Sequence, residues 1–168
     1  MKFKSILLVK KFRSFFRQDW FFQILFIPTF FLLGLARMAV LMFKFTRIAT
    51  LLGQSISVET QPVLSVSTSE LELKRLKQIS RLIITTSRYC PWKANCFAQA
   101  IVGRFWLGIF GFPYRIYFGL RRDVDGLKAH AWVTSGAFYV TGGNGFQDHT
   151  VVGCYCCKTC KDSAKARQ

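Results

Sequence analysis

The sequence predicts an α+β protein in which helices pack on an antiparallel sheet. Residues 70–88 and 95–110 space their apolar side chains as core-facing helices do. The pattern then changes, because residues 114–155 alternate apolar and polar side chains in short runs separated by Gly-containing turns. Helices that precede a set of strands, instead of alternating with them, are typical of α+β folds.

A basic and apolar segment precedes this core. Residues 1–19 carry Lys and Arg side chains between phenylalanines, and residues 20–36 carry no charge. Pro28 lies inside the apolar run and Arg37 ends it. Three interpretations stay open: a signal peptide cleaved near Ala36, a membrane-spanning helix, and a pair of helices lying on the core domain or on a membrane surface. The interruptions favour the third.

The core domain is predicted to begin at Ser69. This residue precedes an amphipathic stripe, and Glu72 completes a helix capping box three residues later. The chain then divides into four parts: a basic and hydrophobic helical region at 1–53, a linker at 54–68, the core domain at 69–155, and a Cys- and Lys-rich tail at 156–168.

The charge balance favours an anionic partner. The formal net charge is +16, from 24 Lys and Arg against 8 Asp and Glu. A membrane surface or an acidic peptide would be a suitable partner. A basic surface that contacts only solvent explains the charge equally well. Nucleic acid is excluded as the expected partner, because the sequence has neither zinc-finger spacing nor an RNA-binding aromatic signature.

The six cysteines do not have the spread of a secreted disulfide framework. Cys90 and Cys96 lie close together, and the others crowd the C-terminus. We therefore expect a reducing, cytoplasmic setting. Only Cys157 and Cys160 have CxxC spacing, whereas a tetrahedral zinc site usually needs two separated pairs. We interpret the last cysteines as part of an unstructured tail and predict no metal site.

Cys96 is the candidate nucleophile. It lies in the first turn of a helix that we expect to start near Asn95. The partial positive charge and free amides of a helix N-terminus lower the pKa of a thiol there and favour the reactive thiolate. The backbone amide of Cys96 would also point toward the oxyanion of an acyl intermediate.

His130 is the candidate base. It lies on a strand predicted over 127–134, on the face shared with Trp132 and Thr134. The opposite face is more apolar and is expected to face the core. Small neighbours, Ala129 and Ala131, leave room for a partner on the polar face. Spacing alone is weak support, because most Cys and His pairs in a sequence are unrelated.

The third catalytic position has two candidates after His130. Asp148 can reach the imidazole if the loop 142–145 folds back, but a solvated loop carboxylate is an equal interpretation. Asn144 is the alternative, since an amide also orients an imidazole.

These motifs together resemble one family. In order and spacing, the chain is similar to the leader-peptidase (B) proteins of lasso-peptide maturation, of the microcin-processing type. The resemblance rests on these segments: Arg47-Ile48-Ala49-Thr50-Leu51-Leu52-Gly53, Pro91-Trp92-Lys93-Ala94-Asn95-Cys96-Phe97-Ala98-Gln99-Ala100, Gly111-Phe112-Pro113, Tyr117-Phe118-Gly119-Leu120, His130-Ala131-Trp132-Val133 and Val140-Thr141-Gly142-Gly143. The final cysteine cluster departs from the family pattern.

The resemblance implies a transglutaminase-like, papain-related fold with Cys96 as nucleophile and His130 as general base and acid. It implies proteolytic removal of the leader from a ribosomally made precursor. The implied partners are the precursor leader, a separate leader-recognition protein, and an asparagine-synthetase-like cyclase that uses ATP. Some members also need ATP for processing; the sequence has no phosphate-binding loop, so ATP is assigned to no residue. Where members carry an aspartate about a dozen residues after the histidine, this chain has Gly142.

Two other functions stay open. The chain could be a non-catalytic, transglutaminase-like scaffold that binds precursor or cyclase at the membrane, which the missing aspartate favours. It could also be a membrane-anchored or secreted thiol enzyme that acts on cell-surface peptides. Association with the membrane through the N-terminal region is compatible with the cytoplasmic setting.

Overall fold

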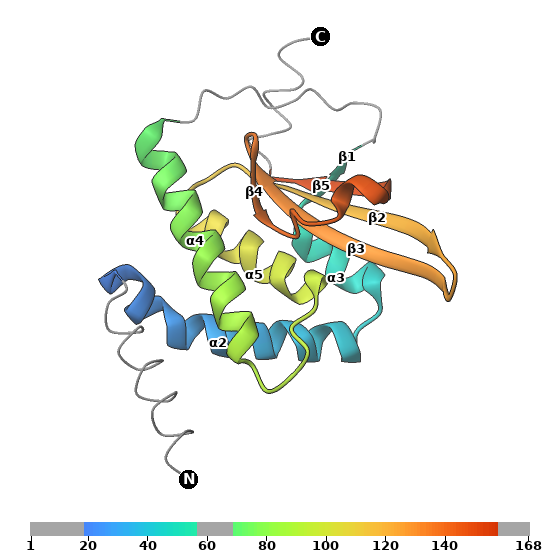
Figure 1. Cartoon of the computed structure of the whole chain (residues 1–168), viewed down its shortest axis with the longest axis horizontal. Coiled ribbons are helices and arrows are strands. Elements are labelled where there is room, and N and C mark those ends of the chain that lie inside the picture. The colour runs from blue at the N-terminus through green and yellow to red at the C-terminus, as the bar shows by residue number, and fades with distance from the viewer. Residues whose placement is uncertain (1–18, 57–68, 158–168) are drawn as a thin grey trace.

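The structure, a computed structural model, describes residues 19–56 and 69–157. Within these ranges the chain is a mixed α+β fold, as predicted (Figure 1). The elements in order are α2 (Trp20–Met42), α3 (Phe45–Leu52), β1 (Gln54–Ile56), α4 (Glu70–Tyr89), α5 (Cys96–Ile109), β2 (Arg115–Asp123), β3 (Gly126–Ser135), β4 (Phe138–Thr141), the 3₁₀ turn η1 (Phe146–Asp148) and β5 (Thr150–Cys156).

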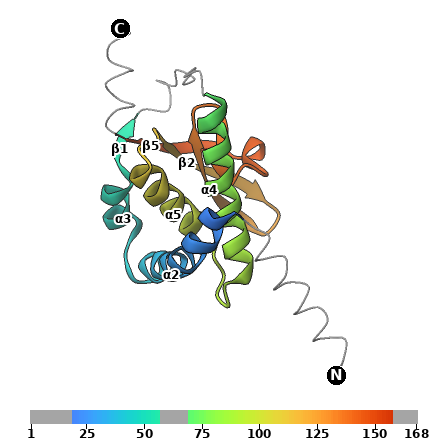
Figure 2. The same ribbon diagram turned by 90° about the vertical axis from the view of Figure 1, so that its left-hand side faces the viewer.

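The strands form one antiparallel sheet in the order β1-β5-β2-β3-β4. Helices α4 and α5 lie on one face of the sheet, and α5 lies between the sheet and α2 (Figures 1 and 2). The core fills the space between these layers. Its fully buried members include Leu33 from α2, Ile79 and Ile83 from α4, Leu107 from α5 and Val133 from β3.

A local signal explains where α4 begins. The Ser69 hydroxyl accepts from the Glu72 amide, and the Glu72 carboxylate accepts from the Ser69 amide, so the predicted capping box is confirmed. The two bonds satisfy amides that the first helical turn leaves without partners. The following stripe then buries one side of α4 against the sheet and α5.

In the described part of the N-terminal region, α2 is one long helix that continues through Pro28. Helix α2 is long and apolar enough, by length and composition, to cross a membrane. It is also docked on the domain: the buried Trp106 indole of α5 donates to the Thr29 hydroxyl at 3.1 Å. Of the basic segment predicted over residues 1–19, residues 1–18 lie outside the described residues.

The long hairpin β2–β3 sets which side chains share a face. Tyr117 lies opposite Trp132, Phe118 opposite Ala131, and Gly119 opposite His130. Phe118 and Ala131 belong to the core between sheet and helices, whereas Tyr117 and Trp132 form a second cluster with Cys154. Alternate residues of a strand point to opposite faces, so this second cluster lies on the face away from α4 and α5.

Two predicted boundaries differ from the structure. The linker expected over 54–68 begins with strand β1, which pairs with β5 from Gln54 opposite Cys156 to Ile56 opposite Cys154. Three residues with two polar side chains carry no sequence signal for a strand; the partner strand supplies it. The tail is predicted to start at residue 156, but Cys156 is still a buried residue of β5. Residues 57–68 and 158–168 lie outside the described residues.

Candidate active site

Cys96 is the first residue of α5, as predicted. The side-chain oxygen of the N-cap residue Asn95 accepts from the Ala98 amide at 3.1 Å. In the described part of the chain, the backbone N–H groups of Cys96 and Phe97 make no hydrogen bond. These amides point out of the positive end of the helix and are available to an oxyanion beside the Cys96 sulfur.

The loop that leads to Cys96 is held against α2. The Trp92 ring lies 4.9 Å from the Phe30 ring, centroid to centroid. A Cβ atom added at Gly34 would lie 3.0 Å from Trp92 Cζ2, so the absent side chain lets the indole approach the helix. The Gln99 side chain closes the loop from within α5, because its amide donates to the Ala94 carbonyl at 2.8 Å.

His130 occupies β3 on the same face as Trp132, with ring centroids 5.9 Å apart. Its Nε2 lies 2.8 Å from the carbonyl oxygen of Gly142. A carbonyl can only accept, so Nε2 carries the proton and Nδ1 keeps its lone pair. Gly142 therefore contributes a main-chain oxygen at the position where the resembled family carries an aspartate.

Gly142 can make this approach only without a side chain. Its φ of +69° lies in the left-handed region. An added Cβ would lie 2.4 Å from the Ala131 carbonyl oxygen and 2.9 Å from Trp132 Cα. The backbone after β4 thus presses against β3 directly beside His130.

His149 is a neighbour of His130 that the sequence reasoning missed. The two imidazole centroids are 5.2 Å apart. His149 Nδ1 lies 2.7 Å from the Gly145 carbonyl oxygen, so Nδ1 carries the proton and Nε2 is free. The two rings are held in opposite tautomers. The available signal was that the chain has two histidines and that the second directly follows the candidate Asp148.

Asp148 lies in the same loop but turns to another partner. Its carboxylate accepts from Arg121 at 3.2 Å, and its side chain is 62 % exposed. No hydrogen bond joins Asp148 or Asn144 to His130 among the described residues. The structure therefore brings His130 together with Gly142 and His149, and neither predicted third residue is hydrogen-bonded to it among the described residues.

Cys96 and His130 approach the sheet from different sides. Cys96 packs with the core between the sheet and the helices, and its neighbour Phe97 contacts Phe118 with ring centroids 5.2 Å apart. His130 lies on the opposite face, next to Trp132. In the described ranges, no hydrogen bond connects Cys96 with His130.

The comparisons with known proteins identify the family. The family model described as the transglutaminase-like superfamily matches residues 39–152, about two thirds of the chain. The chain belongs to the transglutaminase-like superfamily. No curated protein and no solved structure matches the chain significantly. The superfamily includes cysteine peptidases, which agrees with the predicted reaction class at this coarse level. The match begins inside α2, so it includes part of the predicted N-terminal region.

A cysteine that acts as a nucleophile must ionise readily. Two of the chain's cysteines are disfavoured for that role. Burial raises the pKa of the Cys90 thiol, and burial raises the pKa of Cys154 to about 12. Cys96, by contrast, is partly exposed and is the first residue of α5.

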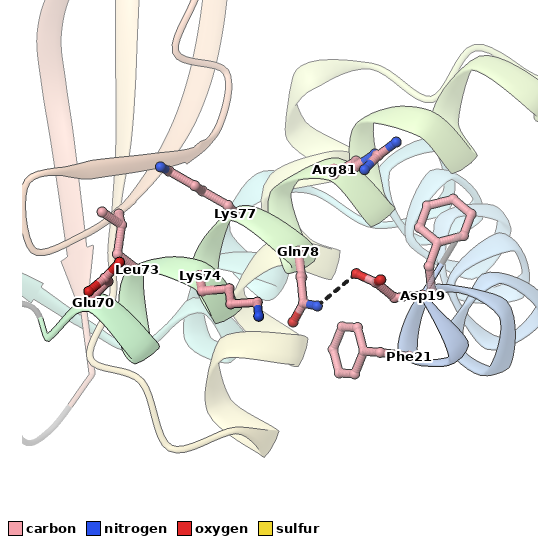
Figure 3. Close-up of a pocket in the computed structure, with 9 residues that line it drawn as sticks. Asp19, Phe21, Glu70, Leu73, Lys74, Lys77, Gln78 and Arg81 are labelled. Carbon is pink, nitrogen blue, oxygen red and sulfur yellow. Dashed lines mark hydrogen bonds between the residues drawn. The ribbon is translucent and has the colours of Figure 1, made fainter. Parts of the chain in front are cut away.

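A surface cavity of about 440 Å³ lies away from these residues, between the start of α2 and α4 (Figure 3). Asp19 and Gln78 meet across it, where the Gln78 amide donates to the carboxylate at 3.0 Å. Its lining mixes cations with carboxylates and includes neither Cys96 nor His130.

Proposed function

We propose that the protein is a cysteine peptidase that removes the leader from a ribosomally made lasso-peptide precursor. The observation that carries the proposal is the position of Cys96 as the first residue of α5 in a member of the transglutaminase-like superfamily. The resemblance of the motif around Cys96 to lasso-peptide leader peptidases supports the choice of substrate.

The chemistry follows from that position. The Cys96 thiol gives its proton to a base, and the thiolate attacks the carbonyl carbon of the scissile peptide bond. The amides of Cys96 and Phe97 stabilise the oxyanion. The base returns the proton to the leaving amine, which departs as the C–N bond breaks. Water then hydrolyses the thioester and restores the thiol.

His130 is the proposed base, through its unprotonated Nδ1. In the described structure it lies on the other face of the sheet from the residues that surround Cys96. Strand β4 begins to pair with β3 only at Val133, so His130 lies where that side of β3 has no partner strand among the described residues. A dyad with Cys96 therefore requires β3 to present His130 toward the helices.

The partners follow from the same proposal. The leader would be presented by a separate recognition protein, and an asparagine-synthetase-like cyclase would then close the lasso with ATP. The net charge of +16 suits an acidic leader, and we expect the reaction in the cytoplasm.

Cleavage of the precursor tests the proposal. Purified protein is incubated with the precursor and its recognition protein, and the products are weighed by mass spectrometry. Cys96→Ala should bind the complex and leave it uncleaved, whereas the matched control Cys90→Ala should cleave it. Cleavage by Cys96→Ala at the wild-type rate would falsify the mechanism. His130→Ala and Asp148→Asn then test the base and the third position separately.

A second candidate, the non-catalytic scaffold, is favoured by one observation: Cys96 and His130 lie toward opposite faces of the sheet. A scaffold would bind the precursor complex without cleaving it. Iodoacetamide labelling separates the two functions, because a catalytic Cys96 reacts faster than an ordinary thiol and its rate persists below neutral pH. A rate for Cys96 equal to that of free cysteine would favour the scaffold.

A further inference from the structure

Helix α2 exposes a continuous apolar stripe on its outer side. Its members recur every three or four residues, so they share one face of the helix. Each is more than half exposed: Trp20 72 %, Ile24 61 %, Ile27 57 %, Phe31 63 %, Leu35 61 %, Met38 56 % and Met42 70 %. No charged side chain interrupts this row, and exposed Phe43 directly follows α2. Soluble monomers rarely leave so long an apolar surface in water.

The opposite side of α2 is part of the folded domain. Leu33 and Thr29 are fully buried, and Thr29 accepts the hydrogen bond from Trp106. Phe21 packs on Phe110 of the loop after α5, with ring centroids 5.5 Å apart. To cross a bilayer, α2 would have to leave α4 and α5 and expose their core side chains. A helix docked on one side and apolar on the other fits a position in the plane of the membrane interface.

The charges around the stripe indicate which surface it meets. Exposed Lys44 and Arg47 directly follow α2, and Arg37 lies within it. In the sequence, Asp19 is the one acidic residue before Glu59. Cationic residues beside an apolar helix face favour a membrane that carries anionic lipids, because apolar burial and charge attraction then act together.

We propose that the outer face of α2 binds an anionic membrane surface, with the helix lying in the interface plane. The inference does not depend on the proposed peptidase function. Trp92 anchors the loop before Cys96 on this same helix, so membrane binding would hold the candidate nucleophile at a fixed height above the lipid headgroups. A substrate or partner bound to the same membrane would then reach Cys96 by diffusing along the membrane surface.

Vesicle co-sedimentation of the full chain tests the proposal. The vesicles contain phosphatidylcholine either alone or mixed with phosphatidylglycerol. The test variant carries Phe31→Ser, Leu35→Ser and Met38→Ser, all at exposed positions. The matched control carries Leu71→Ser, Val124→Ser and Leu127→Ser, which remove even more exposed apolar side chains elsewhere, at 78 %, 99 % and 72 % exposure. Circular dichroism confirms that all proteins are folded.

Wild type and control should bind the phosphatidylglycerol vesicles and bind pure phosphatidylcholine more weakly. The α2 variant should bind about ten-fold more weakly or worse, and added salt should weaken wild-type binding. Equal binding of the α2 variant would show that another part of the chain holds the membrane and would overturn the proposal. So would equal binding to both vesicle types. Light scattering gives a third test. If the wild type is a dimer, the α2 variant is a monomer, and vesicles do not dissociate the dimer, then a second copy of the chain covers the stripe and the proposal is overturned.

Discussion

The contact between Gly142 and β3 allows a quantitative test of the loop beside His130. Replacing Gly142 with Ala adds one methyl group at a position with a φ of +69°. The new Cβ would lie 2.4 Å from the Ala131 carbonyl oxygen. The next nearest atom, Trp132 Cα, would lie 2.9 Å from it. Both are backbone atoms and cannot rotate away as a side chain does, so the loop must move away from the strand.

Two costs add in this variant. A non-glycine residue in the left-handed region costs about 1 kcal/mol. Moving a packed loop to relieve a backbone clash costs about 2 kcal/mol more, within the range of overpacking substitutions. The total is about 3 kcal/mol. For a chain of this size, each kcal/mol lowers Tm by about 2–4 °C, so we expect Tm to fall by about 6–12 °C.

Gly145 is the matched control. Its φ is +82°, and an added Cβ meets nothing within 4 Å. Gly145→Ala should therefore show only the conformational cost, about 1 kcal/mol and about 2–4 °C. Thermal unfolding followed by circular dichroism gives both values under identical conditions.

The tautomer of His130 supplies an independent readout. In the wild type, two-dimensional ¹⁵N NMR of the imidazole should show Nε2 protonated and Nδ1 unprotonated. Gly142→Ala should move the carbonyl and mix the tautomers, whereas Gly145→Ala should leave His130 unchanged. Equal stability of the two variants would refute the close approach of Gly142 to β3, and an Nδ1-protonated His130 in the wild type would refute the hydrogen bond.

Two further predictions test the packing of the helices and the chemistry of a buried thiol. Thr29→Val removes the hydroxyl that accepts the hydrogen bond of the buried Trp106 indole, and urea unfolding should show a loss of stability of about 1–3 kcal/mol. Thr50→Val, at an exposed site, should change the stability little. Equal effects of the two substitutions would contradict the docking of α2. Burial raises the pKa of Cys154 from 9.0 to about 12, so the folded state favours the neutral thiol and its contribution to stability is complete below pH 9. That contribution, up to about 4 kcal/mol, is lost as pH rises from about 9 to about 12. The Tm of Cys154→Ala should therefore fall less than the Tm of wild type over this range. Parallel plots of Tm against pH for the two proteins would contradict the burial of the thiol.

The features that the sequence predicts correctly depend on neighbouring residues. The capping box of Ser69 and Glu72 lies within one helical turn, and Asn95 caps the helix of Cys96 from the adjacent position. The alternation that places His130 opposite the core face is also local. Such signals need no knowledge of the rest of the chain.

The features that the sequence does not predict depend on distant partners. Strand β1 exists because β5 pairs with it, and Gln54 to Ile56 have no strand pattern of their own. The contact of His149 with His130 depends on how the loop after β4 returns over β3. Asp148 was a reasonable candidate because it follows His130 by a short stretch of chain. Its carboxylate instead pairs with Arg121 of β2, a contact that depends on the folded sheet and has no signal in the sequence.

The relation of Cys96 to His130 combines both kinds of information. Strand alternation predicts that His130 points away from the core, and the structure packs Cys96 on the core side of the sheet, which puts the two residues on different faces. A dyad requires one of these statements to fail locally. Strand alternation has period two, so a one-residue slip in β3 would turn His130 toward the helices.

A disulfide between the two positions distinguishes these arrangements. The variant His130→Cys, made together with Cys90→Ala, is treated with a mild oxidant. A bridge to Cys96 needs Cα atoms about 4.4–6.8 Å apart and Cβ atoms that point toward each other. The described faces predict no bridge, so peptide mapping should find Cys96 unlinked to position 130. Rapid and complete bridge formation would show that β3 turns this position toward Cys96 in solution, and the peptidase dyad would then be favoured over the scaffold.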